Sequence, residues 1–104
     1  MIYAVDYTKA VKKVLAKWKK SNPQLFKKAT SILQDIMQHP RAGLGHPEPL
    51  VGGNDITYSR HITAHDRIIY DIYDEKVSVL VIQAEEHYED KYQIKKKDIL
   101  WTPM

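Results

Sequence analysis

The sequence predicts one α+β domain with the element order β-α-α-β-β-β, in which two amphipathic helices pack on one face of a small antiparallel sheet. Helical periodicity occurs twice early in the chain, and three stretches rich in β-branched and aromatic residues come later. A length of 104 residues fits a single domain. Because amphipathic helices bury their apolar sides against a sheet, the other face of that sheet is expected to remain free for a ligand.

The first predicted elements are a short strand over residues 2–5 and a helix over residues 7–19. Apolar residues in this helix recur at the i, i+3, i+4 and i+7 spacing of one helical face. They are Val11, Val14, Leu15 and Trp18. Lysines lie on or near the opposite side, namely Lys9, Lys12, Lys13 and Lys17. We therefore expect one side to face the sheet and a basic side to face solvent.

A second helix is predicted from the Ser-Asn-Pro break to about His39. Either Ser21 or Asn22 can cap it, and Pro23 suits its first turn because the missing N–H would be unpaired there. Pro40 ends it, since the residue before a proline disfavours helical geometry.

The second half of the chain contains the predicted strands, over residues 56–63, 67–73 and 77–88. Residues 74–76 join the last two strands as a tight hairpin. Residues 48–50 are predicted as a further short strand, with Pro49 suited to a sheet edge. The domain is expected to span residues 1–91, followed by a basic C-terminal extension over residues 92–104 that no pattern assigns to an element.

Composition excludes several classes of protein. The chain has no cysteine, which rules out disulfides, thiolate catalysis and cysteine-based zinc sites. No apolar run approaches the roughly 18–20 residues of a membrane helix, and no signal peptide pattern opens the chain. The expected compartment is the cytoplasm, without membrane association.

Charge is unevenly distributed along the chain. Residues 1–30 carry a net charge of +7, residues 31–90 carry −7, and residues 91–104 carry +3. A concentrated basic segment indicates a polyanionic partner such as nucleic acid. The alternative is that the lysines only solvate the surface of the helices.

Two polar residues of the hairpin are expected on the same face. If a three-residue turn places Tyr73 opposite Val77, odd-numbered residues of both strands share one face, barring a bulge. Arg67 and His87 are both odd-numbered. A cation and a titratable imidazole on an open sheet suit the binding and cleavage of a phosphodiester.

Glu48 adds a carboxylate, and its two flanking prolines restrict the backbone that carries it. RNA cleavage needs a base for the 2′-hydroxyl proton, an acid for the departing 5′-oxygen and a cation for the phosphorane. Such a reaction requires no metal ion and no cofactor.

Each residue also has a purely structural interpretation. Arg67 can pair with Asp66 or Asp71, His87 can be an ordinary strand-end histidine, and Glu48 can be a solvated loop residue. Tyr88 can serve only to pack its ring. His61 and His65 are four residues apart, but that spacing brings metal ligands together on a helix, not on a strand and turn, so no metal site is expected.

The segment from Gly43 to Lys91 resembles the YoeB/Txe branch of the RelE/ParE toxin superfamily. Four stretches carry the resemblance, in order: Gly45-His46-Pro47-Glu48-Pro49-Leu50, Tyr58-Ser59-Arg60-His61-Ile62-Thr63, His65-Asp66-Arg67-Ile68-Ile69-Tyr70 and His87-Tyr88. The Pro-Glu-Pro-Leu element and the closing His-Tyr are specific to this branch. The first 40 residues agree with it in layout more than in sequence.

The resemblance implies a RelE-like fold and a toxin of a type II toxin–antitoxin module that cuts mRNA in the A site of the 70S ribosome. By position, Glu48 is the general base, His87 the general acid, Arg67 the phosphate stabiliser, and Tyr88 a residue that places the nucleotide. Expected products carry a 2′,3′-cyclic phosphate or a 3′-phosphate.

The resemblance also implies further contacts and partners. Arg60 and His61 are expected to be secondary RNA contacts, and the basic helices, with Lys9, Lys12 and Lys13, are expected to face ribosomal RNA. A YefM-like antitoxin is expected to cover the active face and to repress the operon together with the toxin. A homodimer is a further expected assembly.

The chain departs from the family pattern at several positions. Val51 stands where the family commonly has lysine, and His61 where it commonly has a second arginine. Glu85 and Glu86 precede the His-Tyr pair, and sixteen residues follow Tyr88. Two other functions stay open: a ParE-like toxin that binds DNA gyrase without nuclease activity, and a catalytically weakened toxin retained for antitoxin binding. The Glu48, Arg67, His87 and Tyr88 set favours the nuclease.

Overall fold

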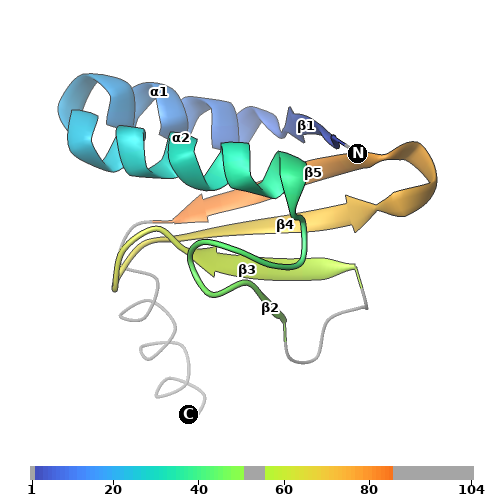
Figure 1. Ribbon diagram of the computed structural model, residues 1–104. Coiled ribbons are helices and arrows are strands. Elements are labelled where there is room, and N and C mark those ends of the chain that lie inside the picture. The colour runs from blue at the N-terminus through green and yellow to red at the C-terminus, as the bar shows by residue number, and fades with distance from the viewer. Residues whose placement is uncertain (1, 51–55, 86–104) are drawn as a thin grey trace, which may run out of the picture.

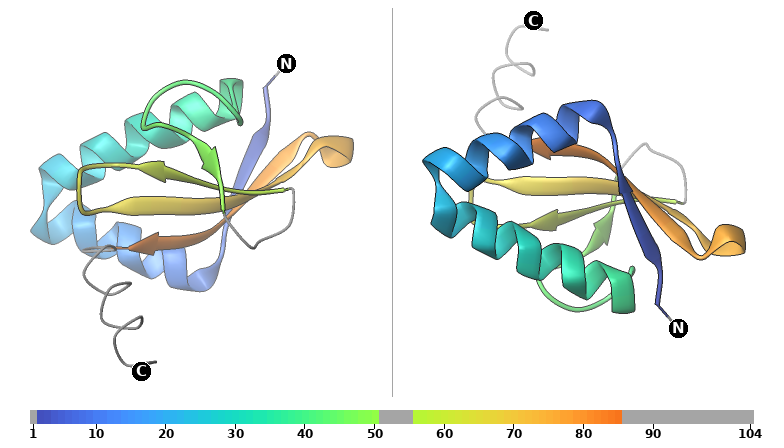
Figure 2. Two further views of the ribbon diagram at one scale, coloured as in Figure 1. Left: turned by 90° about the horizontal axis from the view of Figure 1, so that it is seen from below. Right: turned by 90° about the horizontal axis from the view of Figure 1, so that it is seen from above.

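The computed structural model describes residues 2–50 and 56–85, and within them two helices cover one face of a five-stranded sheet (Figure 1). The elements are β1 (Ala4–Tyr7), α1 (Lys9–Ser21), α2 (Pro23–Gln38), β2 (Glu48–Pro49), β3 (Thr57–His61), β4 (Arg67–Tyr73) and β5 (Ser78–Glu85). Seen from below, the other face of the sheet carries neither helix (Figure 2). The predicted α+β class and its single helical layer are confirmed.

The sheet has the strand order β1-β5-β4-β3-β2 and is mixed. Strands β2 to β5 pair antiparallel, and Pro49 lies in the edge strand β2 as predicted. The expectation of a wholly antiparallel sheet was wrong, because β1 runs parallel to β5. A tight turn forces antiparallel pairing only on the strands that it joins, and β1 and β5 are separated by all the other elements.

The caps set the helix boundaries. Thr8 accepts a hydrogen bond from the Val11 N–H, so α1 begins at Lys9 and Tyr7 belongs to β1. Of the two predicted caps for α2, the structure selects Asn22, whose side chain accepts from the Leu25 N–H at 3.3 Å. Neither helix in the described residues is long and apolar enough to cross a membrane.

The hydrophobic core lies between the helices and the sheet. Its helical side is contributed by residues at helical spacing, and its sheet side by alternate residues of β4 and β5. Fully or almost fully buried members include Val11, Trp18, Ala29, Ile36, Ile68, Tyr70, Ile72, Val79 and Val81. Burial of such side chains stabilises the fold by roughly 1.5–3 kcal/mol each for the larger aliphatic ones, and it leaves the opposite face of the sheet for polar residues.

The β4–β5 hairpin differs from the predicted register at two places, its turn and a bulge. Tyr73 lies opposite Ser78 rather than Val77, because a 3₁₀ turn over Asp74–Lys76 continues into Val77 in a left-handed conformation, with φ of 48°. A bulge beside Ile69 shifts the register once more, so Arg67 lies opposite Glu85. Odd-numbered positions therefore pair at this end of the hairpin. His87 itself lies outside the described residues.

Candidate active site

Polar residues of three neighbouring strands gather on the face of the sheet opposite α1 and α2. Glu48 lies opposite Ser59, and His61 lies opposite Arg67. Directly opposed residues point to the same face, and Ile68, next to Arg67, points into the core. The alternation of β3 and β4 thus places Glu48, Ser59, His61 and Arg67 together on the open face.

Arg67 is at the centre of this group. Its Nη1 donates a hydrogen bond to Ser59 Oγ at 3.1 Å, and its Nη2 lies 3.2 Å from His61 Nε2. Glu48 Oε1 lies 3.6 Å from Nη1, at the edge of ion-pair distance. The Arg67 side chain is 16% exposed and that of Glu48 is 58% exposed. The guanidinium is therefore held by contacts with Ser59 and His61 and faces an exposed carboxylate.

The two aspartates considered as partners of Arg67 make other hydrogen bonds. Asp66 accepts from the Thr63 hydroxyl in the β3–β4 loop, and Asp71 accepts from Thr57 Oγ1 at 2.6 Å across the two strands. Arg67 instead contacts the residues of β2 and β3 that share its face. Ser59, which is 1% exposed, was not predicted as a site residue, although its odd number places it on the same face as His61.

In the contact with Arg67, His61 Nε2 is on the acceptor side, because a guanidinium can only donate. The His46 ring meets the His61 ring edge-on, with 6.4 Å between the ring centroids. Within residues 2–50 and 56–85, no three His, Asp or Glu side chains gather as metal ligands would.

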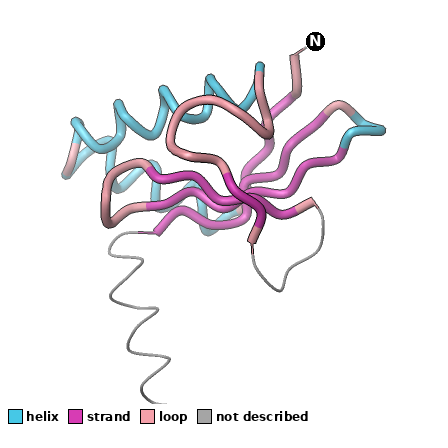
Figure 3. Tube along the Cα trace, turned by 60° about the horizontal axis from the view of Figure 1, so that its bottom comes forward, coloured by secondary structure: helices cyan, strands magenta, loops and turns pink. Residues whose placement is uncertain are grey.

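Glu48 reaches the site through the loop over residues 39–47, which leads from the end of α2 around the β3 edge to β2 (Figure 3). The Gly45 carbonyl accepts from the His61 N–H at 2.7 Å, which fixes the loop to β3. Gly45 has φ of 79°, and a Cβ there would lie 2.4 Å from the His61 carbonyl oxygen. Only glycine allows the backbone to approach so closely.

Arg60, expected to be an RNA contact, has a different role in the structure. It lies on the helix-covered face and is 0% exposed. Its guanidinium donates to three carbonyls of the loop after α2, those of His39, Ala42 and Leu44. It also forms an ion pair with Asp35 at 2.6 Å. A side chain with no exposed surface cannot contact RNA in this arrangement, so Arg60 instead orders the loop that leads to Glu48.

Asp35 and Tyr70 complete the surroundings of Arg60. Burial acts to raise the pKa of Asp35, but hydrogen bonds from Arg60 and from the Leu44 N–H outweigh it and hold this pKa below its ordinary value. The Tyr70 hydroxyl accepts from Arg60 Nε at 3.0 Å and donates to the Pro40 carbonyl at 2.6 Å. Burial raises the pKa of Tyr70, so the phenol stays protonated and can donate.

The remaining predicted site residues are not brought to this face. Lys9, Lys12 and Lys13 are exposed on α1, and the sheet separates this helix from Arg67. His87 and Tyr88 lie outside the described residues, as do Val51 and the predicted extension over residues 92–104. Of the predicted site residues, Glu48, His61 and Arg67 lie together on the open face, and Ser59 lies with them. Arg60 lies on the other face of the sheet.

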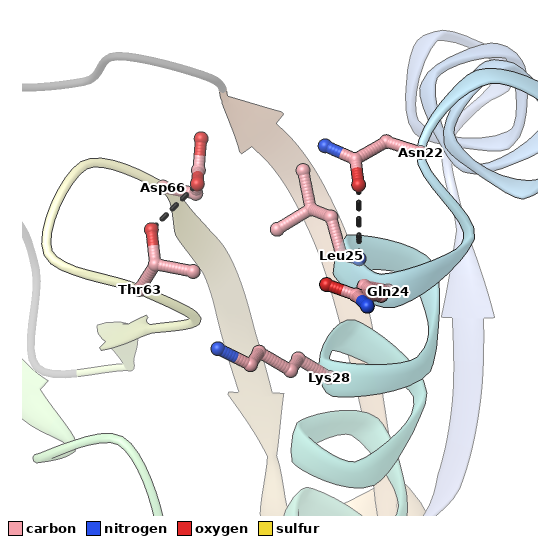
Figure 4. A pocket seen from close by; sticks show the side chains of 6 residues that line it. All are labelled: Asn22, Gln24, Leu25, Lys28, Thr63 and Asp66. Carbon is pink, nitrogen blue, oxygen red and sulfur yellow. Dashed lines mark hydrogen bonds between the residues drawn. The ribbon is translucent and has the colours of Figure 1, made fainter.

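A small polar pocket of about 160 Å³ lies elsewhere, between the N-terminus of α2 and the β3–β4 loop (Figure 4). Its lining residues are Asn22, Gln24, Leu25, Lys28, Thr63 and Asp66. Two of its polar groups are already used, because Asn22 caps α2 and Thr63 donates to Asp66. None of the residues gathered around Arg67 lines it, so the candidate site is an open surface rather than this pocket.

Comparison with known families and proteins gives a consistent result. The family model for the "YoeB-like toxin of bacterial type II toxin-antitoxin system" matches residues 7–88. Toxin YoeB of Escherichia coli O6:H1 is 32% identical over 71 residues, which cover 68% of this chain and 82% of that protein. Toxin YoeB of Streptomyces coelicolor has the same identity and coverage.

Solved structures have the same fold. A YoeB/ParE toxin from Agrobacterium tumefaciens superposes with a TM-score of 0.74 at 29% identity, over 82% of this chain and 99% of that one. A YoeB dimer from Staphylococcus aureus superposes with a TM-score of 0.73 at 20% identity, over 85% of this chain and 100% of that one. At this lower identity the likeness concerns the fold alone.

Proposed function

The chain belongs to the YoeB-like toxins of bacterial type II toxin–antitoxin systems, and we propose that it is an endoribonuclease that cuts mRNA on the ribosome without a metal ion. One observation carries the proposal. Arg67 is oriented by Ser59 and His61 beside the exposed carboxylate of Glu48, on the face of the sheet opposite α1 and α2. A fixed fork of donors next to an accessible base suits a phosphodiester that carries its own nucleophile.

In the proposed reaction Glu48 removes the proton from the RNA 2′-hydroxyl, and the 2′-oxygen attacks the adjacent phosphorus. Arg67 stabilises the charge of the phosphorane, and His87 protonates the departing 5′-oxygen as the P–O5′ bond breaks. The products are a 2′,3′-cyclic phosphate, which water can open to a 3′-phosphate, and a 5′-hydroxyl. Tyr88 places the nucleotide. An acid or base contributes on the order of 10²–10⁴-fold and a charge stabiliser on the order of 10²–10³-fold.

The contact between Arg67 and Glu48 suggests the order of events. In the free protein their charged groups lie 3.6 Å apart, with Glu48 largely in solvent. Such an exposed pair is weak, so an arriving phosphate can take over the guanidinium at little cost. Glu48, released from this contact, can then accept a hydrogen bond from the 2′-hydroxyl. Substrate binding itself would thus make the carboxylate available.

The proposed partners follow from the family and from the charge of the helices. Lys9, Lys12 and Lys13 are exposed on α1 and would contact ribosomal RNA, while the opposite face receives the mRNA. A YoeB–YefM complex and a YoeB dimer are known from Staphylococcus aureus. We extend both assemblies to this chain: a YefM-like antitoxin that covers the active face and represses the operon with the toxin, and a homodimer. Such a toxin acts in the cytoplasm.

The experiment that tests this function compares the wild type with His87→Ala and Arg67→Ala during induced expression in a bacterium, with primer extension on a reporter mRNA. Growth arrest with new cuts near start codons, lost in both variants, supports the nuclease. Arrest without cuts indicates a gyrase poison, and no arrest indicates a toxin retained for antitoxin binding. Both variants should still fold and bind antitoxin.

The chemistry has its own test on programmed ribosomes. Replacing the target ribose by 2′-deoxyribose should stop cleavage, because the nucleophile is then missing. Chelation by EDTA should not stop it, provided that magnesium is restored enough to keep the ribosomes assembled. Cutting of the 2′-deoxy message would refute the proposed mechanism.

A further inference from the structure

We propose that His61 is a proton-linked phosphate-binding residue: it is neutral while it accepts from Arg67, and it takes up a proton when a phosphate binds between the two side chains. The inference rests on the proposed function for the identity of its anion, an RNA phosphodiester. It goes further by assigning a titrating group, and hence a pH dependence, to the binding step itself.

The free state determines the starting protonation. Arg67 Nη2 lies 3.2 Å from His61 Nε2, and a guanidinium nitrogen cannot accept a hydrogen bond. His61 Nε2 therefore carries no proton while this contact exists. Protonation without an anion would place a second cation beside Arg67 and remove the acceptor of this hydrogen bond, both of which are unfavourable.

A bound phosphate reverses both effects. Its oxygens are stronger acceptors for the Arg67 fork than a neutral imidazole, so Nη2 turns to the phosphate and leaves His61 Nε2 without its donor. The imidazole is then next to an added negative charge as well as the Arg67 cation. Nε2 gains a proton from solvent and donates it in a hydrogen bond to a phosphate oxygen, which adds a second charged donor to the site.

Other charged or titratable groups near His61 must be considered. Within the described residues these are Arg67 on β4, His46 in the loop before β2, and Glu48 on β2, which approaches Arg67 from the other side. His46 meets the His61 ring edge-on and is a second candidate for proton uptake. Glu48 favours cations at this site at any pH at which it is ionised.

Thermodynamic linkage sets the size and sign of the effect. If anion binding takes up one proton at His61, the affinity for the anion is greatest at low pH and falls as pH rises, by at most about tenfold per pH unit. Arg67 remains charged throughout this range, so a site that used Arg67 alone would show no such dependence.

Sulfate is a suitable probe, because its charge is constant between pH 5.5 and 8 and it needs no ribosome. The full chain in a His87→Gln background, which removes cleavage and one other imidazole, is titrated with sulfate at constant ionic strength. Binding at this site is followed by NMR through the side-chain N–H signals of Arg67. His61→Arg supplies a permanent cation, His61→Gln a neutral side chain, and His46→Gln tests the other histidine. Circular dichroism confirms that each variant is folded.

We expect the dissociation constant for sulfate to rise several-fold to tenfold per pH unit over part of the range from about pH 5.5 to 8, both in the background protein and in His46→Gln. It should be low and flat in His61→Arg, and high and flat in His61→Gln. If His61→Gln does not fold, the proposal is judged by His61→Arg alone, whose dissociation constant for sulfate should not change with pH. A pH dependence that survives both His61 substitutions, or a flat profile in the background protein, overturns the proposal.

The outcome is independent of the nuclease assay. A protein that shows the linked binding but makes no cuts refutes only the endoribonuclease, and one that cuts mRNA but binds sulfate without pH dependence refutes only the role of His61.

Discussion

Arg60 and Arg67 lie on neighbouring strands, yet their guanidinium groups face opposite sides of the sheet. Arg60 is 0% exposed, and its partners are the carboxylate of Asp35, the Tyr70 hydroxyl and three loop carbonyls. Arg67 is on the open face, with Ser59, His61 and the exposed Glu48 around it. The same side chain therefore organises the backbone on one face and presents a cation to solvent on the other.

The difference lies in whether the partners can be exchanged. The buried Arg60 guanidinium donates to protein acceptors instead of water, and removal of any one acceptor leaves an unsatisfied buried group. Arg67 has partners at 3.1–3.6 Å that water or a phosphate can replace. A buried cation with fixed partners stabilises a structure, whereas a partly exposed cation with replaceable partners can bind a substrate.

Removal of Arg60 should have the largest effect on folding. Arg60→Met leaves Asp35, Tyr70 and the loop carbonyls without their donor, so the free energy of unfolding should fall by about 3–5 kcal/mol. Urea denaturation measures this, and Arg67→Met is the matched control, with an expected loss of about 1 kcal/mol or less. Equal losses in the two variants would contradict the distinction between the two faces.

Arg67→Lys should have the next largest effect, and on activity rather than stability. A lysine ammonium cannot donate to Ser59, His61 and a phosphate as a planar fork does. We expect single-turnover cleavage on programmed ribosomes to slow by on the order of 10²-fold, with an unchanged urea midpoint. Full activity in this variant would mean that charge alone suffices and that the fork geometry is unimportant.

Asp35 gives a pH-dependent prediction. Its pKa is lowered in the folded protein, so its charge stabilises the fold above the unfolded value, about 3.9, and this stabilisation is lost as pH falls through the folded pKa. Asp35→Asn should lower the free energy of unfolding by about 1–3 kcal/mol at neutral pH. The difference in free energy of unfolding between Asp35→Asn and the wild type should become smaller below about pH 4.

Asp74→Asn is the control for this pH series. Hydrogen bonds from Arg41 and Tyr3 also lower the pKa of Asp74, but this carboxylate is exposed in the β4–β5 turn. The same acid titration should therefore show a smaller effect for Asp74→Asn than for Asp35→Asn. A larger effect would mean that the exposed cluster, not the buried arginine, governs acid stability.

The smallest expected effect belongs to Tyr3. Its hydroxyl donates to Asp74 Oδ1 at 2.8 Å, and this hydrogen bond, with partial desolvation, raises the pKa of Tyr3. Ultraviolet titration of the phenol should therefore show that its pKa falls in Asp74→Asn. Tyr3→Phe should change stability less than Asp35→Asn does and leave cleavage unchanged, since the Tyr3 hydroxyl contacts Asp74 in the β4–β5 turn and none of the residues around Arg67. An effect on cleavage would extend the site beyond β2, β3 and β4.

Local patterns predicted much of this fold. Helical periodicity located both helices to within about two residues at their ends, as expected for boundaries judged from sequence, and the β4 strand was predicted with its observed bounds, Arg67–Tyr73. The parallel pairing of β1 was missed because it depends on contacts between the two ends of the domain, and no local pattern encodes such contacts. The left-handed Val77 was missed because a β-branched residue is unusual there.

The candidate site was also predicted in part, again from a local pattern. Strand alternation correctly placed Arg67 on the open face, and it also separates Arg60 from His61, since consecutive residues point to opposite faces. Strand alternation therefore indicated different surroundings for Arg60 and His61, but the family resemblance assigned both residues to RNA contacts. The burial of Arg60 depends on loop carbonyls that converge from 16 to 21 residues away in the sequence, which the sequence pattern does not reveal.

The position of β5 has a consequence for how the protein is made. This strand, the last one described in the chain, lies between β1 and β4 and contributes Val79 and Val81 to the core. During synthesis, β1 emerges first and has no neighbour among the described strands until β5 follows it out of the ribosome. Both helices meanwhile lack part of the surface that they cover. A domain with this strand order cannot complete its sheet or close its core until β5 has left the ribosome, after every other described element has been made.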